Sequence, residues 1–332
     1  MEIRKIEQRE HGRTRSLYET VFAEDSKRFV DYYYEVKTKD NTIYVVEDEE
    51  EICAMIHLNP YVIMANGKEI PAHYIVAVAT KPECRRRGYM GSLLKASLNG
   101  MYKENEPFTF LMPASENIYI PYDFRTVYDQ DQRYYRESQH VEKGTVVRKA
   151  KPEDAGAVAK LANSFLVHHF QLYAKRDAVY YKRLMREYES DEGCLMITEK
   201  EGRITDCQPY VPEEVGEKPK IMIRIVDLKR MLMLLELTCL TAVCFHVTDP
   251  LICENNRCLL VTGSEFSGVM LMEGKPENSE GTITIAALAS LIFGKKTAAQ
   301  IREEAGVRMT DRMQAELEKI VPVNKIFLNE IV

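Results

Sequence analysis

The sequence lacks the features that define several large classes of protein. Lysine and arginine number 45 against 51 aspartate and glutamate residues, which gives a net charge of -6 and a pI near 5.8. A general nucleic-acid binder needs a basic surface that displaces phosphate counterions, so that class is disfavoured. The acidic balance slightly favours a cationic or amine substrate.

Metal-binding and export signals are also missing. The eight cysteines include no CxxC pair and have no histidine nearby at zinc-ligand spacing, so we predict reduced thiols and no metal. Residues 1–13 carry charges without an apolar stretch behind them, unlike a secretory signal. The most apolar run, residues 231–247, contains a glutamate and two threonines and barely reaches the roughly 18 residues of a membrane span. We therefore predict a cytoplasmic protein with no membrane span.

The chain contains a weak internal repeat. Residues 2–22 and 146–166 each read as a short strand leading into an amphipathic helix, and residues 42–62 and 193–211 each read as two strands around a charged turn. We interpret this order as a duplication, although any two strand-turn-strand stretches look alike. After the second copy the chain runs into residues 212–220, a linker rich in Pro, Glu and Lys, whereas the first copy continues into a further strand and a long helix.

From residue 221 the pattern becomes α+β without a motif of its own. Helices are predicted over residues 226–237, 283–293, 297–305 and 309–320, and strands over 242–247, 258–262 and 269–273.

One segment of the first copy carries a local anomaly. Residues 75–79 form a continuous apolar run typical of a strand buried on both faces, and apolar residues from Met90 to Met101 then recur at helical spacing. Three arginines, Arg85, Arg86 and Arg87, crowd the positive end of that helix, where they repel one another and the helix dipole. A bound polyanion would supply the missing negative charge.

Two glycines support this interpretation. Gly88 and Gly91 leave room for backbone N–H groups to point at a diphosphate. The alternative is an exposed arginine-rich turn of the kind common on protein surfaces. The spacing fits neither GxxxxGK[ST] nor GxGxxG, which disfavours nucleotide hydrolysis and hydride transfer.

The segment resembles a known family. Arg85-x-x-Gly88-x-Met90 is similar to the (Gln/Arg)-x-x-Gly-x-(Gly/Ala) signature of the GNAT acetyltransferases, although Met90 replaces a small residue and Gly91 stands one place late. More narrowly, IVAVATKPECRRRGYMGSLL and MPASENIYIPYDF resemble the enhanced-intracellular-survival (Eis) acetyltransferases. That resemblance extends through LTCLTAVCFHVTDPLICENN, ITIAALASLIFG and FLNEIV.

The resemblance implies an α+β (mixed α/β) protein of three domains. These are a catalytic GNAT domain over residues 1–143, a truncated GNAT-like structural domain with its linker over 144–217, and a sterol-carrier-protein-like domain over 218–332. It implies acetyl-CoA as co-substrate, and a homo-oligomer, since such enzymes form hexamers. The residues it assigns to acetyl-CoA are Ile75, Val76, Ala77, Val78, Arg85, Arg86, Arg87, Gly88, Tyr89, Met90, Gly91 and Ser115.

The same resemblance implies two catalytic groups. Tyr119 matches the general acid of the family. Proton transfer from a free phenol to a thiolate is uphill by only about two kcal/mol. Family members often carry Phe-Gly where this chain has Tyr122-Asp123. The family uses the C-terminal carboxylate, here on Val332, on the base side of the reaction. Without the resemblance, residues 327–332 would be read as a docked apolar tail.

The acceptor side is predicted from charge. Asp25, Asp31 and Glu35 lie near the segment that borders the substrate cleft in the family, and Glu330 lies near the terminus. Acidic groups there would attract cationic amines, although the first three equally suit the solvated face of a helix. His168-His169 fits a surface helix better than a ligand pair.

Two functions remain open at this point. The first is an acetyl-CoA-dependent N-acetyltransferase acting on primary amines of an aminoglycoside-like or polyamine-like polycation, or on a peptide amine. The second is a non-catalytic protein that binds acetyl-CoA and uses its C-terminal domain to hold a lipid or to assemble.

Overall fold

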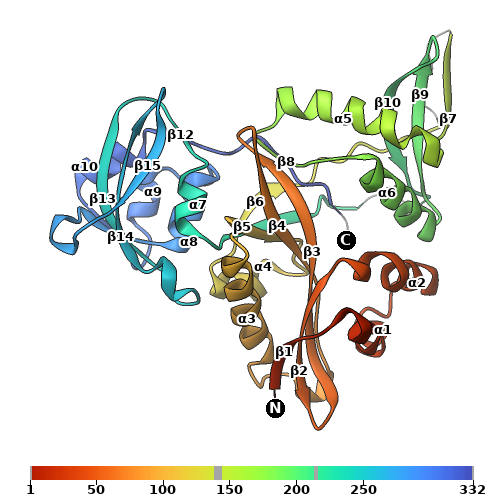
Figure 1. Ribbon diagram of the computed structural model, residues 1–332, viewed down its shortest axis with the longest axis horizontal. Helices are drawn as coiled ribbons and strands as arrows, with labels where there is room; N and C mark the ends of the chain where they lie inside the picture. Colours follow the sequence, from red (N-terminus) through yellow and green to blue (C-terminus); the bar gives the residue numbers. More distant parts are fainter. Residues whose placement is uncertain (1, 138–143, 213–215, 331–332) are drawn as a thin grey trace.

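The computed structural model describes residues 2–137, 144–212 and 216–330. Figure 1 shows three units in chain order, coloured red to yellow, green, and cyan to blue. The mixed α/β fold that we predicted is confirmed.

The N-terminal unit is built on a long sheet with the strand order β1-β2-β3-β4-β5-β11-β6. Its strands are β1 (Glu2–Lys5), β2 (Thr42–Asp48), β3 (Glu51–Ala65), β4 (Lys68–Thr80), β5 (Phe108–Leu111), β6 (Arg125–Asp129) and β11 (Lys220–Ile225). The strands β4 and β5 run parallel, whereas the other neighbours on this path are antiparallel. Two short strands, β8 (Leu172–Ala174) and β19 (Ile326–Phe327), extend the sheet from the far end of β3.

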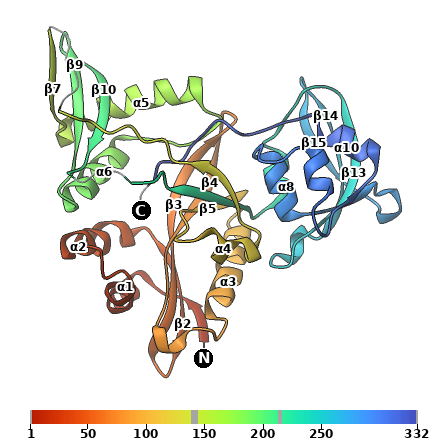
Figure 2. The same cartoon turned by 180° about the vertical axis from the view of Figure 1, so that it is seen from behind.

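Helices cover both faces of this sheet. The helices α1 (Arg15–Val21) and α2 (Lys27–Val36) lie on one side, and α3 (Tyr89–Lys103) lies on the other, as Figures 1 and 2 show. Leu93, Leu94, Leu98 and Met101 of α3 are fully buried, because their helical spacing places them on one face toward the strands.

The middle unit repeats the order of the first one. It contains β7 (Thr145–Lys149), α5 (Ala155–His169), α6 (Ala178–Ser190), β9 (Cys194–Lys200) and β10 (Arg203–Tyr210). The strand β9 pairs antiparallel with both β7 and β10, as β2 pairs with β1 and β3. The unit has a small core of its own, and His168 and His169 are exposed at the end of α5, on a surface helix as expected.

The C-terminal unit is a five-stranded sheet with short helices against it. The strand order is β15 (Gly268–Glu273), β14 (Arg257–Ser264), β13 (Thr241–Thr248), β16 (Gly281–Thr284) and β17 (Arg308–Met309). Its helices are α7 (Leu228–Leu232), α8 (Ile285–Ile292), α9 (Ala298–Arg302) and α10 (Asp311–Leu317), and β12 (Glu236–Leu237) pairs with β18 (Ile320–Val321).

The helix predicted over residues 226–237 was wrong in length. The helix α7 spans only five residues and begins after Asp227, whose carboxylate caps the Arg230 amide. Leu234, Leu235 and Leu237 after α7 pack into the core around β12 instead, and Met233 is exposed. Leucine-rich stretches fit a buried helix or a buried strand equally well, so periodicity alone could not place this boundary.

The long sheet crosses the domain limits expected at residues 143 and 217. The strand β8 comes from the middle segment, whereas β11 and β19 come from the C-terminal one. The last described residues thus return from the C-terminal unit to the first sheet (Figure 2). Among the described residues, no helix is long and apolar enough to cross a bilayer.

Candidate active site

A gap opens where β4 and β5 stop pairing. The two strands pair only at Tyr74 with Phe110 and at Ile75 with Leu111, although β4 continues to Thr80. In the described chain, no strand takes the β5-facing edge of β4 beyond Ile75. Parallel strands that diverge in this way leave backbone groups free to bind a ligand.

A β-bulge lies at the start of that gap. The register between β3 and β4 shifts between Met55 and His57, and on β4 Ala77 adopts a left-handed φ of 48°. Such a conformation in an alanine costs of order 1 kcal/mol, and it is common next to functional sites because a bulge re-aims the backbone. Ala77 and Val78, predicted to orient acetyl-CoA, are half-buried at this bulge, next to the more buried Ile75 and Val76.

The arginine turn lies between the end of β4 and the start of α3. Arg85, Arg86 and Arg87 are all exposed, and among the described residues no carboxylate pairs with them. The Arg85 Nε donates to the Thr80 carbonyl at 3.4 Å, and an Arg87 Nη donates to the Glu83 carbonyl at 3.2 Å. The turn therefore keeps the uncompensated positive charge that its sequence indicated.

The backbone of this turn depends on left-handed residues. Arg86 has a φ of 64°, and Gly88, which caps α3, has a φ of 79°. Glycine adopts this region without strain, and the three amides that begin the helix have no carbonyl one turn earlier. Tyr89 is buried and Met90 half-buried, so these two residues offer backbone N–H groups rather than side chains to an anion.

Gly91 has a second role that the sequence did not reveal. A Cβ at this position would lie 2.8 Å from the Tyr122 hydroxyl and 3.2 Å from its Cε1. The Tyr122 ring therefore lies against the first turn of α3. This packing connects the arginine turn with the segment that carries Tyr119.

Tyr119 ends the short helix α4 (Glu116–Tyr119), which begins after the exposed Ser115. Its side chain is 8% exposed, and its ring meets that of Phe124 edge-on at 5.7 Å. Burial raises the pKa of Tyr119 to about 12. The phenol is thus a weaker acid than a free tyrosine, and it stays protonated at neutral pH.

A cavity of about 300 Å³ lies between the first sheet and the middle unit. Tyr61 of β3 lines one wall, and Tyr180, Leu184 and Glu187 of α6 line another, together with Glu330 from the chain end. The pKa of the Tyr74 phenol is raised by burial first, and then by the charges of Glu330 and Glu187 and by Tyr119. Tyr119 itself is not among the residues that line this cavity.

Glu330 is held by several neighbours. The Tyr180 hydroxyl donates to its Oε2 at 2.7 Å, and the Arg176 guanidinium lies 3.6 Å from its Oε1. The Gln130 amide donates to the backbone carbonyls of Leu328 and Glu330, which fixes the returning chain. Val332, the predicted carboxylate donor, lies outside the described residues.

The other predicted acceptor residues lie outside the lining of this cavity. Asp25 accepts a hydrogen bond from the Tyr18 hydroxyl at 2.7 Å, and burial raises its pKa. Asp31 forms an ion pair with Arg15 at 2.5 Å, and Glu35 is exposed on α2. The structure thus brings Glu330, but not these three, to the cavity wall.

Glu187 was missed because α6 belongs to a unit that we interpreted as structural. It follows Tyr180 and Leu184 at the spacing i, i+4, i+7, which forms one helical stripe. An acidic residue within a stripe of aromatic and apolar residues is unusual and could have drawn attention to it.

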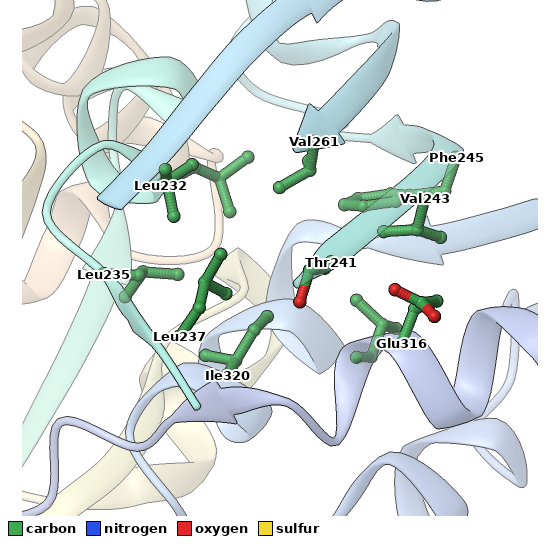
Figure 3. A pocket seen from close by; sticks show the side chains of 11 residues that line it. Leu232, Leu235, Leu237, Thr241, Val243, Phe245, Val261, Glu316 and Ile320 are labelled. Atoms are coloured by element: carbon green, nitrogen blue, oxygen red, sulfur yellow. The ribbon is translucent and has the colours of Figure 1, made fainter. Parts of the chain in front are cut away.

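Two further features have simpler explanations. His73, Glu104 and Glu106 bring ligand atoms within 4.8 Å of one another, but Glu106 already accepts from the His73 ring and amide, and Glu104 pairs with Lys5. In the C-terminal unit, an apolar cavity of about 10 Å³ lies among leucine, valine and isoleucine side chains (Figure 3). That volume holds roughly one water molecule, far too little for a lipid.

Comparison with known proteins agrees with these features. Residues 2–127 match the family described as acetyltransferase (GNAT) domain, and residues 229–329 match the sterol carrier protein domain. No curated protein sequence matched the chain.

Solved structures of the same overall fold cover nearly the whole chain. A probable N-acyltransferase from Enterococcus faecalis V583 aligns with a TM-score of 0.79 at 14% identity over 97% of both chains. A GCN5-related N-acetyltransferase from Anabaena variabilis ATCC 29413 aligns at 0.73 and 14% over 98% of both chains. Eis1 from Mycobacterium abscessus aligns at 0.68 and 13% over 96% of this chain and 97% of its own. The chain is therefore an acyltransferase with an N-terminal GNAT acetyltransferase domain and a C-terminal sterol-carrier-protein-like domain.

Proposed function

We propose that the protein is an Eis-like, acetyl-CoA-dependent N-acetyltransferase that acts on a small cationic amine. The observation that carries the proposal is the gap between β4 and β5, which has the bulge at Ala77 on its edge and the arginine turn at its mouth. The backbone amides that begin α3 and the exposed Arg85, Arg86 and Arg87 suit a pyrophosphate, and the free edge of β4 suits an acyl thioester.

The cavity offers carboxylates to a cationic acceptor, but its wall is not uniformly acidic. Asp177, Glu187 and Glu330 line it together with Lys37, Lys175 and Arg183, and Tyr61 and Tyr180 supply aromatic surface. A volume of about 300 Å³ lies at the lower end of the range for small-molecule sites, which favours a compact amine over a large one. The carboxylates would hold an ammonium group, which must lose a proton before it can attack the thioester. The predicted part of Val332 in that proton loss stays a prediction.

Tyr119 would donate the proton that the departing thiolate requires. With a pKa of about 12 against about 8.5 for a thiol, this transfer is uphill by about 5 kcal/mol. A turnover of about 10 per second allows a total barrier of about 16 kcal/mol, so the step is feasible. The alternative of a lipid-binding protein loses support, because the C-terminal cavity holds about one water molecule.

The test compares Tyr119→Phe with Tyr44→Phe in release of free thiol from acetyl-CoA. The acceptors are spermidine, an aminoglycoside and a lysine-containing peptide. Tyr44 is a matched control because its hydroxyl lies against Gly100 at the far end of α3. We expect Tyr119→Phe to lower kcat by about 100-fold, with acetyl-CoA affinity by calorimetry unchanged within about twofold. Equal turnover by the two variants would refute the role of Tyr119, and binding without turnover on any amine would favour a non-catalytic protein.

The pH profile provides an independent test. A general acid is active while protonated, so activity that depends on Tyr119 is lost only as the pH rises through about 12. We therefore expect that any decline of kcat between pH 8 and pH 10 in the wild type is also present in Tyr119→Phe. A decline with a midpoint near pH 9 that this substitution removes would contradict the buried, high-pKa phenol.

A further inference from the structure

One arginine is buried completely between two domains. Arg224 lies on β11, the strand that the C-terminal segment inserts between β5 and β6 of the first sheet. Its side chain is 0% exposed, and one Nη lies 2.6 Å from the Asp249 carboxylate, which is also 0% exposed. A buried ion pair is retained only where further hydrogen bonds satisfy both groups, so its remaining contacts are informative.

Asp249 is itself held rigidly by the C-terminal domain. Its Oδ1 accepts hydrogen bonds from the Leu251 and Ile252 amides, and its Oδ2 accepts one from the Asn255 side chain. The same turn contacts α3, because the side-chain amide of Asn99 donates to the Leu251 carbonyl at 3.0 Å. The carboxylate that fixes Arg224 therefore belongs to a built turn and not to a mobile side chain.

The other face of Arg224 holds the segment that carries Tyr119. The Arg224 Nε donates to the Tyr122 carbonyl at 2.9 Å, and an Nη lies 3.9 Å from the Asp123 carboxylate. Asp123 has a left-handed φ of 65°, and among the described residues its Oδ2 is buried without a hydrogen-bond partner. Only the Arg224 guanidinium balances this carboxylate at close range in the described chain.

This contact acts on both halves of the proposed site. Tyr119 stands three residues before Tyr122, and the Phe124 amide closes the loop onto the Tyr119 carbonyl at 3.4 Å. The Tyr122 ring packs against Gly91 in the first turn of α3. A shift of the Tyr122 carbonyl would therefore move the Tyr119 phenol relative to the arginine turn.

We infer that Arg224 is a positioning residue, through which Asp249 of the C-terminal domain fixes the Tyr119 loop against α3. This inference rests on the proposed function, since it requires Tyr119 to act on the reacting atoms. It gives the C-terminal domain a part in acyl transfer through a buried ion pair, without any ligand of its own.

The experiment uses Arg224→Lys in the full-length protein. Lysine keeps the charge opposite Asp249, but a single ammonium cannot also replace the Nε hydrogen bond to the Tyr122 carbonyl. With the fastest amine of the acceptor panel, we expect kcat to fall by roughly 10- to 100-fold, because displacements near 1 Å reach that scale. Acetyl-CoA affinity should stay within about twofold, because α3 is held by its own buried face. Arg312→Lys, at an ion pair of the same domain whose guanidinium is exposed, should leave kcat unchanged.

A double substitution separates positioning from general damage. If Arg224 acts through Tyr119, then Arg224→Lys should cost less than about twofold in a Tyr119→Phe background. An equal loss in both backgrounds would overturn the inference, and so would an unchanged kcat in Arg224→Lys. If kcat of Tyr119→Phe equals that of the wild type, the proposed function itself is overturned instead. Should Arg224→Lys fail to fold, Asp249→Asn, which keeps the shape and removes the charge, is subject to the same criteria.

Discussion

The ion pair between Arg176 and Glu330 allows the contribution of Glu330 to stability to be measured separately from its contribution to amine binding. Their side chains are 11% and 3% exposed, and the Arg176 guanidinium lies within 5.2 Å of the Tyr180 ring centre and 5.0 Å of the Phe327 ring centre. Glu330→Gln keeps an acceptor for the Tyr180 hydroxyl but leaves the guanidinium without its counter-charge. Breaking a buried pair in this way costs about 3 kcal/mol, and we expect the free energy of unfolding to fall by about that amount.

Adding Arg176→Met should restore most of that stability, because no uncompensated charge remains in the cavity wall. The matched control is Glu69→Gln, which breaks the exposed pair with Lys175 and should change stability by less than about 0.5 kcal/mol. Urea denaturation of the four proteins measures these differences. If Glu330→Gln costs no more than Glu69→Gln, our account of its burial is wrong.

The same variants test whether Glu330 binds the amine. If its carboxylate holds the ammonium group, KM for the amine should rise about 10-fold in both Glu330→Gln and the double variant, although only the first is unstable. A double variant with a normal KM would mean that Glu330 only balances Arg176.

Two further predictions concern single buried groups. Burial lowers the pKa of His57 from 6.5 to about 3, so the unfolded chain binds the extra proton first and stability falls with pH below about 6.5. Between pH 6.5 and pH 4.5 this contribution is about 2 kcal/mol, so urea denaturation should show that His57→Gln loses less stability over this range than the wild type; equal losses would contradict it. Gly91→Ala should lower the free energy of unfolding by about 1–3 kcal/mol through its clash with the Tyr122 ring, and less in a Tyr122→Phe background. Thermal denaturation measures these losses. Equal losses in the two backgrounds would show that contact with the Tyr122 hydroxyl does not cause the destabilisation.

The arginine turn could be recognised without a structure because its signals are local. A buried apolar strand, three arginines, two glycines and an amphipathic helix stand next to one another in the chain, and each has its own physical meaning. The internal repeat was visible for the same reason, since strand, helix and hairpin order is written along the sequence. Acidic residues near the family's cleft were a weaker guide, because charge alone does not say which face of a helix a carboxylate occupies.

The remaining features depend on contacts between distant segments. The left-handed Ala77 results from strand register between β3 and β4, and no residue type signals it. Glu187 and Glu330 come from different units and line one cavity because β19 brings the chain back beside β8. Arg224 reads in the sequence as an ordinary residue of an apolar strand, and only the packing of Asp249 and Tyr122 around it gives it a role. The sequence by itself therefore determined the arginine turn and the order of the units, whereas tertiary structure decided the cavity at Glu187 and Glu330 and the link between domains, because those depend on long-range pairing that no local pattern encodes.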